Sequence, residues 1–264
     1  MIKAKKSLGQ NFLRSKTAID TMIKAGNISS SDTVLEIGPG KGAITGKLLE
    51  YAGKVIAIEK DKELIILLQE KFTESIKEGK LILAEDDAGT MDISSYTKGP
   101  YKIVANIPYY ITGLLLRKFL SEKHQPSHIV FLVQKEVADR IVARDKKESI
   151  LSLSVKAYGT PAYITKVQKR FFSPEPRVDS AIISISNISK LHFKDGKEEE
   201  RFFDIVKVGF AHKRKVLRKN LEGVSSMENI TKAFTECGIP EKARAEDLSF
   251  GTWLSLSRVL SLKK

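Results

Sequence analysis

Apolar residues in the first half of the chain fall in short runs that alternate with segments of helical spacing. The runs are rich in β-branched side chains, which is typical of buried strands. They occupy residues 33–37, 54–58, 80–84, 101–105 and 128–133. Around them, apolar residues recur every three or four positions, which predicts helices at residues 16–25, 43–51, 62–72 and 114–120. Strands and helices that alternate over short connections indicate a parallel sheet with helices on both faces.

The pattern changes in the second half of the chain. Residues 150–158 fit either a helix or the end of a strand, and the β-branched segments 162–167 and 181–185 predict an antiparallel hairpin added to the sheet. The polar stretch 186–200 is the best candidate for a domain boundary. Beyond it, four further helices are predicted at residues 201–221, 227–237, 243–248 and 252–262. We therefore expect an α/β fold: a Rossmann-like sheet domain at residues 1–190 and a small all-helical domain at residues 191–264.

A glycine-rich loop joins the first predicted strand to the helix that follows it. Gly38, Gly40 and Gly42 stand in the sequence VLEIGPGKGAIT. Glycines are needed here because a side chain would block the approach of a ligand to the backbone at the helix N-terminus. Glu59 ends the next strand about 20 residues later, where a carboxylate can accept both hydroxyls of a ribose. This arrangement predicts a ligand that contains a nucleoside.

The loop does not by itself decide between a dinucleotide and S-adenosylmethionine. The dinucleotide fingerprint fits if Ala43 takes its last position, but Pro39 lacks an N–H that a pyrophosphate would use. S-adenosylmethionine has an adenosine and a charged sulfonium but no phosphate, so it tolerates that loss. Asp86 and Asp87 follow the third strand, where a carboxylate could hold the adenine amino group. The alternative for this acidic pair is a solvated loop.

The tetrapeptide Asn106-Ile107-Pro108-Tyr109 closes the fourth strand, at the carboxyl edge where ligands of such sheets bind. The exocyclic amine of adenine is a poor nucleophile because its lone pair is delocalised into the ring. The side-chain oxygen of Asn106 and a backbone carbonyl can accept its two hydrogens and favour a pyramidal nitrogen. Pro108 fixes the turn, and Tyr109 offers an aromatic face to an extruded base. Such a turn would suit the transfer of a methyl group from S-adenosylmethionine to this amine. No strong base is needed for that reaction, because the amine loses its proton after it has received the methyl group.

The charge of the chain points to an anionic partner. With 45 Lys and Arg against 32 Asp and Glu, the net charge is +13, as expected of a protein that meets phosphate backbones. A predicted helix over residues 201–219 would leave its basic side chains in solvent, where we expect them to contact RNA phosphates. These candidate RNA-binding residues are Lys213, Arg214, Lys215, Arg218 and Lys219.

Composition excludes several other classes of protein. The single Cys237 excludes a disulfide framework and a cysteine-built zinc site, and the four histidines lack ligand spacing, so we predict no metal site. No stretch approaches the ~18 apolar residues of a membrane span. The basic N-terminus has no apolar run after its charges, unlike a secretory signal. We therefore expect a cytoplasmic protein that does not bind membranes.

Eight segments together resemble one family in its order along nearly the whole chain. They are KKSLGQNFL, VLEIGPGKGAIT, IEKD, DDA, NIPYYIT, VQKEVADR, FFSPEPRVDSA and FAHKRKVLRKNL. The chain resembles the bacterial 16S ribosomal RNA adenine N6-dimethyltransferases (the KsgA/RsmA family), which implies a methyltransferase sheet that uses S-adenosylmethionine. Tyr110 departs from the pattern, because many relatives have Asn at this position.

The resemblance also implies the roles of individual residues. Asn106 and Tyr109 would hold the target adenine, and Phe172 would stack on its other face. Asp87 is preferred to Asp86 because it directly precedes Ala88, as in the D-A pair of the family. The implied cofactor contacts are Asn11, Leu13, Gly38, Gly40, Glu59, Asp87 and Asn106.

The activity implied is dimethylation of N6 of two adjacent adenines near the 3′ end of 16S ribosomal RNA during small-subunit assembly. Its partner would be that RNA in the 30S subunit or its precursor, and we expect the chain to act as a monomer. The 23S RNA methyltransferase of macrolide resistance shares the glycine loop and the NIPY turn, although VQKEVADR and AHKRKVLRKNL favour the 16S enzyme. A binding factor that keeps the fold without catalysis and a nicotinamide oxidoreductase are the remaining alternatives.

Overall fold

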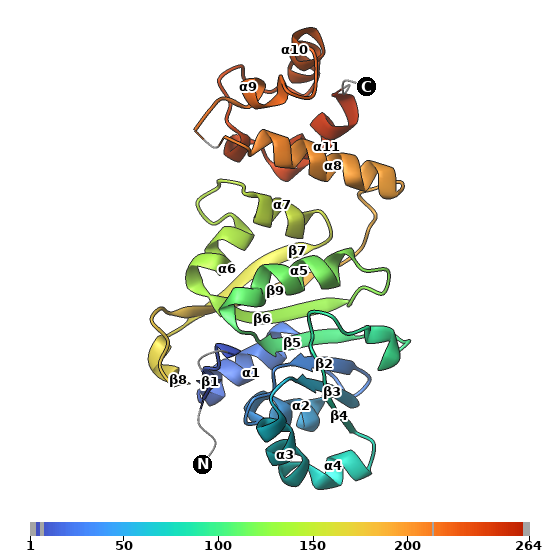
Figure 1. Cartoon of the computed structure of the whole chain (residues 1–264), viewed down its shortest axis with the longest axis vertical. Helices are drawn as coiled ribbons and strands as arrows, with labels where there is room; N and C mark the ends of the chain where they lie inside the picture. The colour runs from blue at the N-terminus through green and yellow to red at the C-terminus, as the bar shows by residue number, and fades with distance from the viewer. Residues whose placement is uncertain (1–3, 6–7, 213, 261–264) are drawn as a thin grey trace. The chain divides into compact units, whose positions relative to one another are not determined.

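The chain divides into two compact units. The computed structural model describes residues 4–5, 8–212 and 214–260 of the 264-residue chain (Figure 1). The first unit, here called the sheet unit, comprises residues 1–138 and 159–188, and the second, the helical unit, comprises residues 139–158 and 189–264. The division after residue 188 falls within the polar stretch 186–200. The prediction of one continuous domain over residues 1–190 differs from this division at residues 139–158, which group with the helical unit.

The core of the sheet unit is a seven-stranded sheet with the order β4-β3-β2-β5-β6-β9-β7. The first five strands in this order are parallel, whereas β9 is antiparallel to both β6 and β7. The strand bounds are β2 Thr33–Ile37, β3 Lys54–Glu59, β4 Leu81–Glu85, β5 Lys102–Asn106, β6 His128–Gln134, β7 Thr160–Val167 and β9 Ser180–Ser186. The predicted parallel sheet and the added antiparallel strands are therefore confirmed.

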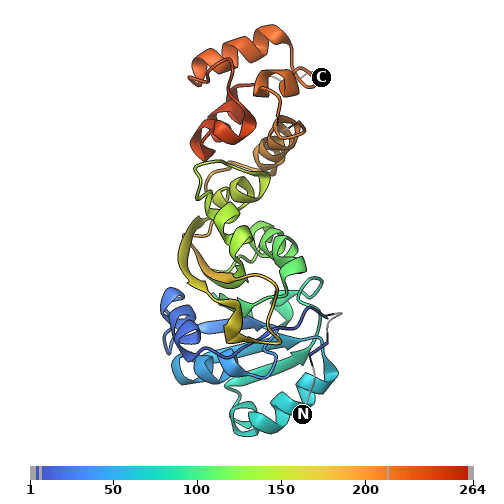
Figure 2. The same ribbon diagram turned by 90° about the vertical axis from the view of Figure 1, so that its left-hand side faces the viewer.

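Helices cover both faces of this sheet. Successive strand residues point to opposite faces, and in β2 both Val34 and Leu35 are fully buried, as are Val55 and Ile56 in β3. In Figure 2, α1 (blue) and α5 (green) lie on opposite sides of the sheet. The helices of this unit are α1 Lys16–Ala25, α2 Ala43–Tyr51, α3 Lys62–Lys71, α4 Thr73–Lys77 and α5 Thr112–Ser121. A further helix, α6 Lys135–Val142, begins in the sheet unit and ends in the helical unit. Up to residue 134, every element predicted from the hydrophobic pattern is present with its ends within two residues.

Short elements complete the sheet unit. A 3₁₀ turn, η2, spans Ile93–Ser95, a second, η3, follows β5 at Tyr109–Ile111, and a third, η4, spans Lys169–Phe171. A two-stranded sheet pairs β1 (Phe12–Leu13) with β8 (Phe172–Ser173). The hydrophobic pattern did not predict this pair, because two-residue strands carry no periodic signal.

The helical unit packs around aromatic residues. Trp253 is fully buried, stacks on Phe210 with ring centroids 5.6 Å apart, and donates its indole N–H to the carbonyl of Ala245 at 3.2 Å. Phe202 is also fully buried. The helices are α7 Ile150–Lys156, α8 Gly196–Gly209, α9 Leu217–Leu221, α10 Met227–Glu236 and α11 Phe250–Val259. Within the described part of the chain, no helix is long and apolar enough to cross a membrane.

The prediction of one continuous helix over residues 201–221 is wrong. The helix ends at Gly209 and resumes at Leu217. Gly209 lies so close to the ring of Trp253 that a Cβ there would collide with it, and its carbonyl accepts a hydrogen bond from the side chain of Asn220. Tertiary packing therefore stops the helix where local spacing alone would continue it. The helix predicted at residues 243–248 is only a 3₁₀ turn, η5, at Ala245–Asp247.

Candidate cofactor and adenine site

A pocket of about 220 Å³ lies at the carboxyl ends of the parallel strands. Its walls come from residues 8–12, the glycine loop, the ends of β3 and β4, and the segment after β5. These segments are far apart in sequence, but parallel strands bring their carboxyl ends to the same sheet edge. The pocket brings together most of the predicted site residues, namely Asn11, Gly38, Gly40, Glu59, Asp87, Asn106 and Tyr109.

The glycine loop needs glycine for its backbone and for its close contacts. Gly38, Gly40 and Gly42 have φ values of 67°, 59° and 74°, in the left-handed region that residues with a Cβ rarely adopt. A Cβ on Gly40 would lie 2.9 Å from the ring of Phe12, and one on Gly42 would lie 2.5 Å from the ring of Phe72. The loop is thereby held tightly at the N-terminus of α2, with its backbone open to the pocket.

Glu59 is a buried carboxylate fixed by three backbone amides. It is 7% exposed. Its Oε1 accepts hydrogen bonds from the amides of Lys60 and Asp61 at 2.9 and 3.0 Å, and its Oε2 accepts one from Gly40 at 3.2 Å. Burial raises the pKa of Glu59, and the three amides partly offset this by favouring the charged form. The carboxylate is therefore held at the pocket wall, where it can accept the hydroxyls of a ribose.

The two acids after β4 have different partners. Asp86 accepts hydrogen bonds from the amide of Asp87 at 2.7 Å and from the hydroxyl of Tyr96 at 2.6 Å. Asp87 accepts the amide of Gly89 at 2.8 Å and pairs with Lys60 at 2.8 Å, and its side chain is 45% exposed. The hydrogen bond from Lys60 holds the pKa of Asp87 below its usual value. Both acids line the pocket, and every carboxyl oxygen of the pair accepts a hydrogen bond. Asp87 differs in that one of its partners is the exposed side chain of Lys60.

The side chain of Asn106 has a fixed orientation. Its Nδ2 donates a hydrogen bond to the backbone carbonyl of Asn11 at 2.9 Å. The Nδ2 of Asn11 in turn donates to the carbonyl of Gly9 at 3.3 Å. Because the amide nitrogen of Asn106 is engaged, its Oδ1 is the atom available to accept an N–H from a ligand in the pocket.

Tyr109 is anchored by a residue that the sequence did not single out. Its ring is half-buried, and its hydroxyl lies 2.9 Å from the hydroxyl of Ser180, which is fully buried in β9. Burial raises the pKa of Tyr109, so the phenol is neutral at physiological pH. The hydrogen bond fixes the tip of the ring and leaves the ring itself at the pocket wall.

The structure does not bring Leu13 and Phe172 into the pocket lining. They lie opposite each other in the β1–β8 pair, are 5% and 4% exposed, and belong to the hydrophobic core. The adjacent Phe171 is the exposed aromatic residue of this segment, at 37%, with the guanidinium of Arg170 5.3 Å from its ring centre. Stacking of Phe172 on a base therefore requires its ring to turn out of the core.

The predicted RNA-binding residues have unequal surroundings. Arg214, Lys215 and Lys219 are exposed. Arg218 is instead tied to its own unit, since it donates to Thr231 at 2.9 Å and pairs with Glu241 at 3.6 Å. Lys213 lies outside the described residues.

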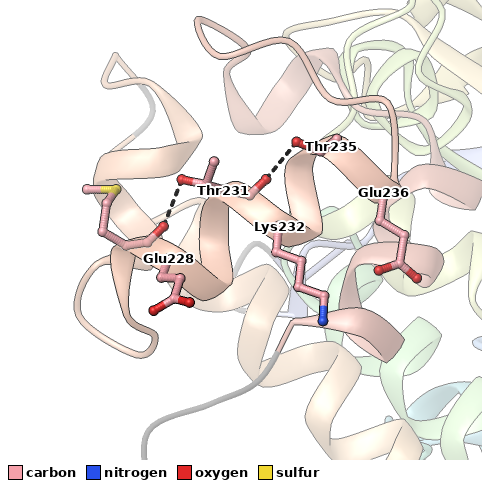
Figure 3. Close-up of a pocket in the computed structure, with 6 residues that line it drawn as sticks. Glu228, Thr231, Lys232, Thr235 and Glu236 are labelled. Carbon is pink, nitrogen blue, oxygen red and sulfur yellow. Dashed lines mark hydrogen bonds between the residues drawn. The ribbon is translucent and has the colours of Figure 1, made fainter.

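A shallow hollow on the exposed face of α10 carries no comparable chemistry. Figure 3 shows Glu228, Lys232 and Glu236 along this face, with two threonines between them. The hydroxyls of Thr231 and Thr235 donate to helix carbonyls at 2.8 and 3.0 Å, so they are already satisfied. We assign no ligand to this hollow.

Residues 1–262 match the model of a protein family described as ribosomal RNA adenine dimethylase. The chain belongs to the ribosomal RNA adenine dimethylase family. The resemblance inferred from the motifs is thereby confirmed, and the chain is an rRNA adenine dimethyltransferase whose cofactor is S-adenosylmethionine.

Relatives within this family extend over nearly the whole chain. The protein named Ribosomal RNA small subunit methyltransferase A of Dehalococcoides mccartyi is 40% identical over 257 residues, 97% of this chain and 88% of the relative. That of Fusobacterium nucleatum is 39% identical over 260 residues, 97% of each chain.

Two solved structures share the fold. The 23S rRNA methyltransferase ErmE has a TM-score of 0.79 at 25% identity and covers 95% of this chain and 99% of its own. A dimethyladenosine transferase from Plasmodium falciparum has a TM-score of 0.79 at 27% identity, with 93% and 95% covered. These matches confirm the predicted α/β methyltransferase fold.

The residues of the pocket fit S-adenosylmethionine. The open glycine backbone and the buried carboxylate of Glu59 suit a ribose, and Asp87 suits an adenine amino group. Pro39 presents no N–H where a pyrophosphate would need one. S-adenosylmethionine has no pyrophosphate, so it does not need that N–H.

Proposed function

We propose that this chain transfers methyl groups to N6 of two adjacent adenines near the 3′ end of 16S ribosomal RNA, in the 30S subunit or its precursor, and that it acts as a monomer. The observation that carries the proposal is the amide of Asn106, which Asn11 orients at the edge of the pocket formed by the glycine loop. An acceptor fixed in this way can polarise a weakly nucleophilic amine without a strong base.

The choice of small-subunit RNA rests on the relatives. Those named small subunit methyltransferase A are 34–40% identical over 97–100% of the chain, whereas ErmE, a 23S rRNA methyltransferase, is 25% identical. The fold and the catalytic turn do not separate the two substrates, since ErmE covers 95% of the chain at the same TM-score as the dimethyladenosine transferase.

We assign cofactor binding to residues from five segments of the sheet unit. When bound, S-adenosylmethionine supplies an electrophilic methyl group carried on a sulfonium. Glu59 accepts the ribose hydroxyls, Asp87 accepts the adenine amino group, and Gly38 and Gly40 leave room for the cofactor against the backbone. Asn11, Leu13 and Asn106 complete the set; Leu13 contributes through its backbone, because its side chain is 5% exposed and packs in the core.

The target adenine is assigned to Asn106, Tyr109 and Phe172. The Oδ1 of Asn106 accepts one N–H of the exocyclic amine, and the ring of Tyr109 stacks on the base. Phe172 closes on the second face only after its ring leaves the core beside Leu13. The proton that the amine loses goes to solvent, so no general base is required. Lys213, Arg214, Lys215, Arg218 and Lys219 are assigned to RNA, with Arg218 acting chiefly by holding α9 to α10.

The test compares three substrates for methyl transfer. Purified chain and radiolabelled S-adenosylmethionine are incubated with 30S particles that lack the modification, with 50S particles and with protein-free 23S RNA. We expect label in 30S particles alone, at dimethyladenosine, and a loss of at least ~100-fold in kcat/KM for Asn106→Ala, because the positioned acceptor acts in the transition state.

Two outcomes would contradict the proposal. Label in 23S RNA would support a 23S enzyme. Tight binding to 30S particles without any transfer would support an assembly factor that has kept the fold. Glu228→Ala, on the exposed face of α10, is the control variant and should methylate as the wild type does.

A further inference from the structure

One wall of the cofactor pocket is a segment from the beginning of the chain. We call Lys5 and residues 8–12 the N-terminal strap. Residues 8–12 line the pocket directly. At its far end the strap joins the sheet unit through the β1–β8 pair, and in its middle the carbonyl of Asn11 accepts the hydrogen bond from Asn106. Its near end needs a separate attachment.

The buried carboxylate of Asp61 attaches this end to the sheet unit. The side chain of Asp61 is 0% exposed. Its Oδ1 accepts a hydrogen bond from the Nζ of Lys5 at 2.6 Å, and its Oδ2 accepts one from the Nε2 of Gln10 at 2.9 Å. The strap is closed on itself at the same place, because the amide of Lys5 donates to the Oε1 of Gln10 at 2.8 Å. Asp61 thus holds two ends of one loop at once.

Asp61 also touches the ribose-binding wall. Its amide donates to the Oε1 of Glu59 at 3.0 Å, and its Oδ1 accepts the amide of Glu63 as the N-cap of α3. Burial opposes the charge of Asp61, but the hydrogen bonds from Lys5 and Gln10 outweigh it, so the pKa of this acid lies below its usual value. When one partner of a buried carboxylate is removed, the charge is left without compensation and the local structure is strongly destabilised.

We propose that Asp61 is a positioning residue that clamps the N-terminal strap over the cofactor pocket and thereby sets the affinity for S-adenosylmethionine and for its demethylated product. This inference rests on the proposed function. The clamp acts through Gln10 on its neighbour Asn11, whose carbonyl orients Asn106. It forms part of the pocket before any RNA is present, so its effect is expected on cofactor binding in the free protein.

A plain structural role for Asp61 would be the capping of α3. Asp61→Asn separates the two roles, because Asn is as good an N-cap as Asp but carries no charge for Lys5. Lys5→Met removes the charged partner of Asp61 and leaves the N-cap of α3 in place. Glu63→Gln is the matched control, since Glu63 also contacts Lys5, at 2.9 Å, but its side chain is 59% exposed and makes a surface pair of little energy.

The experiment measures the dissociation constant of S-adenosylhomocysteine by calorimetry for the full chain and these variants. We expect Lys5→Met and Asp61→Asn each to weaken binding by ~10-fold, the scale of one hydrogen bond to a charged group. The double variant should be little weaker than Asp61→Asn alone, because Lys5→Met removes a pairing that Asp61→Asn has already lost. Glu63→Gln should bind within about twofold of the wild type. In hydrogen exchange, the amides of Leu8 and Gln10 should lose protection in Asp61→Asn while α3 keeps its own.

Three kinds of result would contradict the role of Asp61 as a clamp. Variants that bind as tightly as a binding-competent wild type would overturn the inference and leave the proposed function standing. Single effects that multiply in the double variant, or faster exchange in α3 without change in the strap, would also overturn it. A wild-type chain that binds no S-adenosylhomocysteine would overturn the proposed function and the clamp together.

Discussion

Ser180 lies 71 residues from Tyr109 along the chain, yet the two hydroxyls form one hydrogen bond at the candidate adenine site. We expect Ser180→Ala to free the phenol and to raise the KM for 30S particles by ~3–10-fold, the usual range for one buried hydrogen bond. In a Tyr109→Phe background the same substitution should add little, because the bond is already absent. Steady-state kinetics of the four proteins measure this coupling.

The control for this cycle is another buried serine of the same strand. Ser184 is 7% exposed and lies 2.6 Å from a ring nitrogen of His128, away from the pocket lining. Ser184→Ala should leave the KM for 30S particles unchanged in both backgrounds. If the effects of Ser180→Ala and Tyr109→Phe multiply instead, Ser180 does not act through the phenol.

The residues of the candidate site show which contacts the sequence could predict and which it could not. Glu59 and Asn106 end β3 and β5, and the glycines follow β2, so the local pattern placed them all at one sheet edge. Ser180 and Asp61 matter through partners more than 50 residues away, which no local pattern encodes. Phe172 was assigned to the pocket by its motif, but its pairing with Leu13 places its ring in the core.

At the scale of elements, strand β2 carries a buried acid, Glu36, next to helix α2. Glu36 of β2 is 1% exposed, and its polar neighbours are the hydroxyl and the backbone of Thr45 in α2, which offset only part of the cost of burial. Burial raises its pKa to about 8, and the nearby charge of Glu59 acts in the same direction. Glu36 is therefore protonated at neutral pH when the chain is folded.

This protonation predicts how stability depends on pH. Between the ordinary value of 4.5 and about 8, the folded state binds a proton that the unfolded state has lost, so the free energy of unfolding falls as pH rises, by at most ~1.4 kcal/mol per pH unit. Glu36→Gln, which keeps shape and neutrality, should remove this slope. Urea unfolding at pH 5, 6, 7 and 8 measures it. Equal slopes in the two proteins would show that Glu36 is ionised in the fold.

Elements were predictable where local pattern and tertiary packing agree. The strands and helices up to residue 134 fall within two residues of their predicted ends, because each carries a clear apolar period and a glycine, polar or capping boundary. The interruption between α8 and α9 was missed because its cause is the ring of Trp253 against Gly209. The hydrophobic spacing of residues 201–221 contains no trace of that contact.

At the scale of the whole molecule, the net charge of +13 is expected to appear as a salt-dependent affinity for RNA. The break in the predicted helix changes which cations contribute. Arg214 and Lys215 lie in the exposed connection before α9, whereas Arg218 is held by Thr231 and Glu241. The exposed pair should therefore carry more of the contact with phosphates than Arg218 does.

Binding to 30S particles at a series of salt concentrations tests this difference. Arg214→Ala and Lys215→Ala should each weaken binding and reduce the slope of log K against log salt by ~0.7–0.9, the value for one phosphate contact. Lys232→Ala removes the same charge from α10, where Glu228 and Glu236 flank it (Figure 3), and should leave the slope unchanged. Arg218→Ala should leave the slope nearly unchanged. It should instead lower the stability of the helical unit, because its guanidinium joins α9 to α10. Slopes that fall equally for all four variants would mean that affinity follows total charge, and the surface around Arg214 would then have no special part in binding.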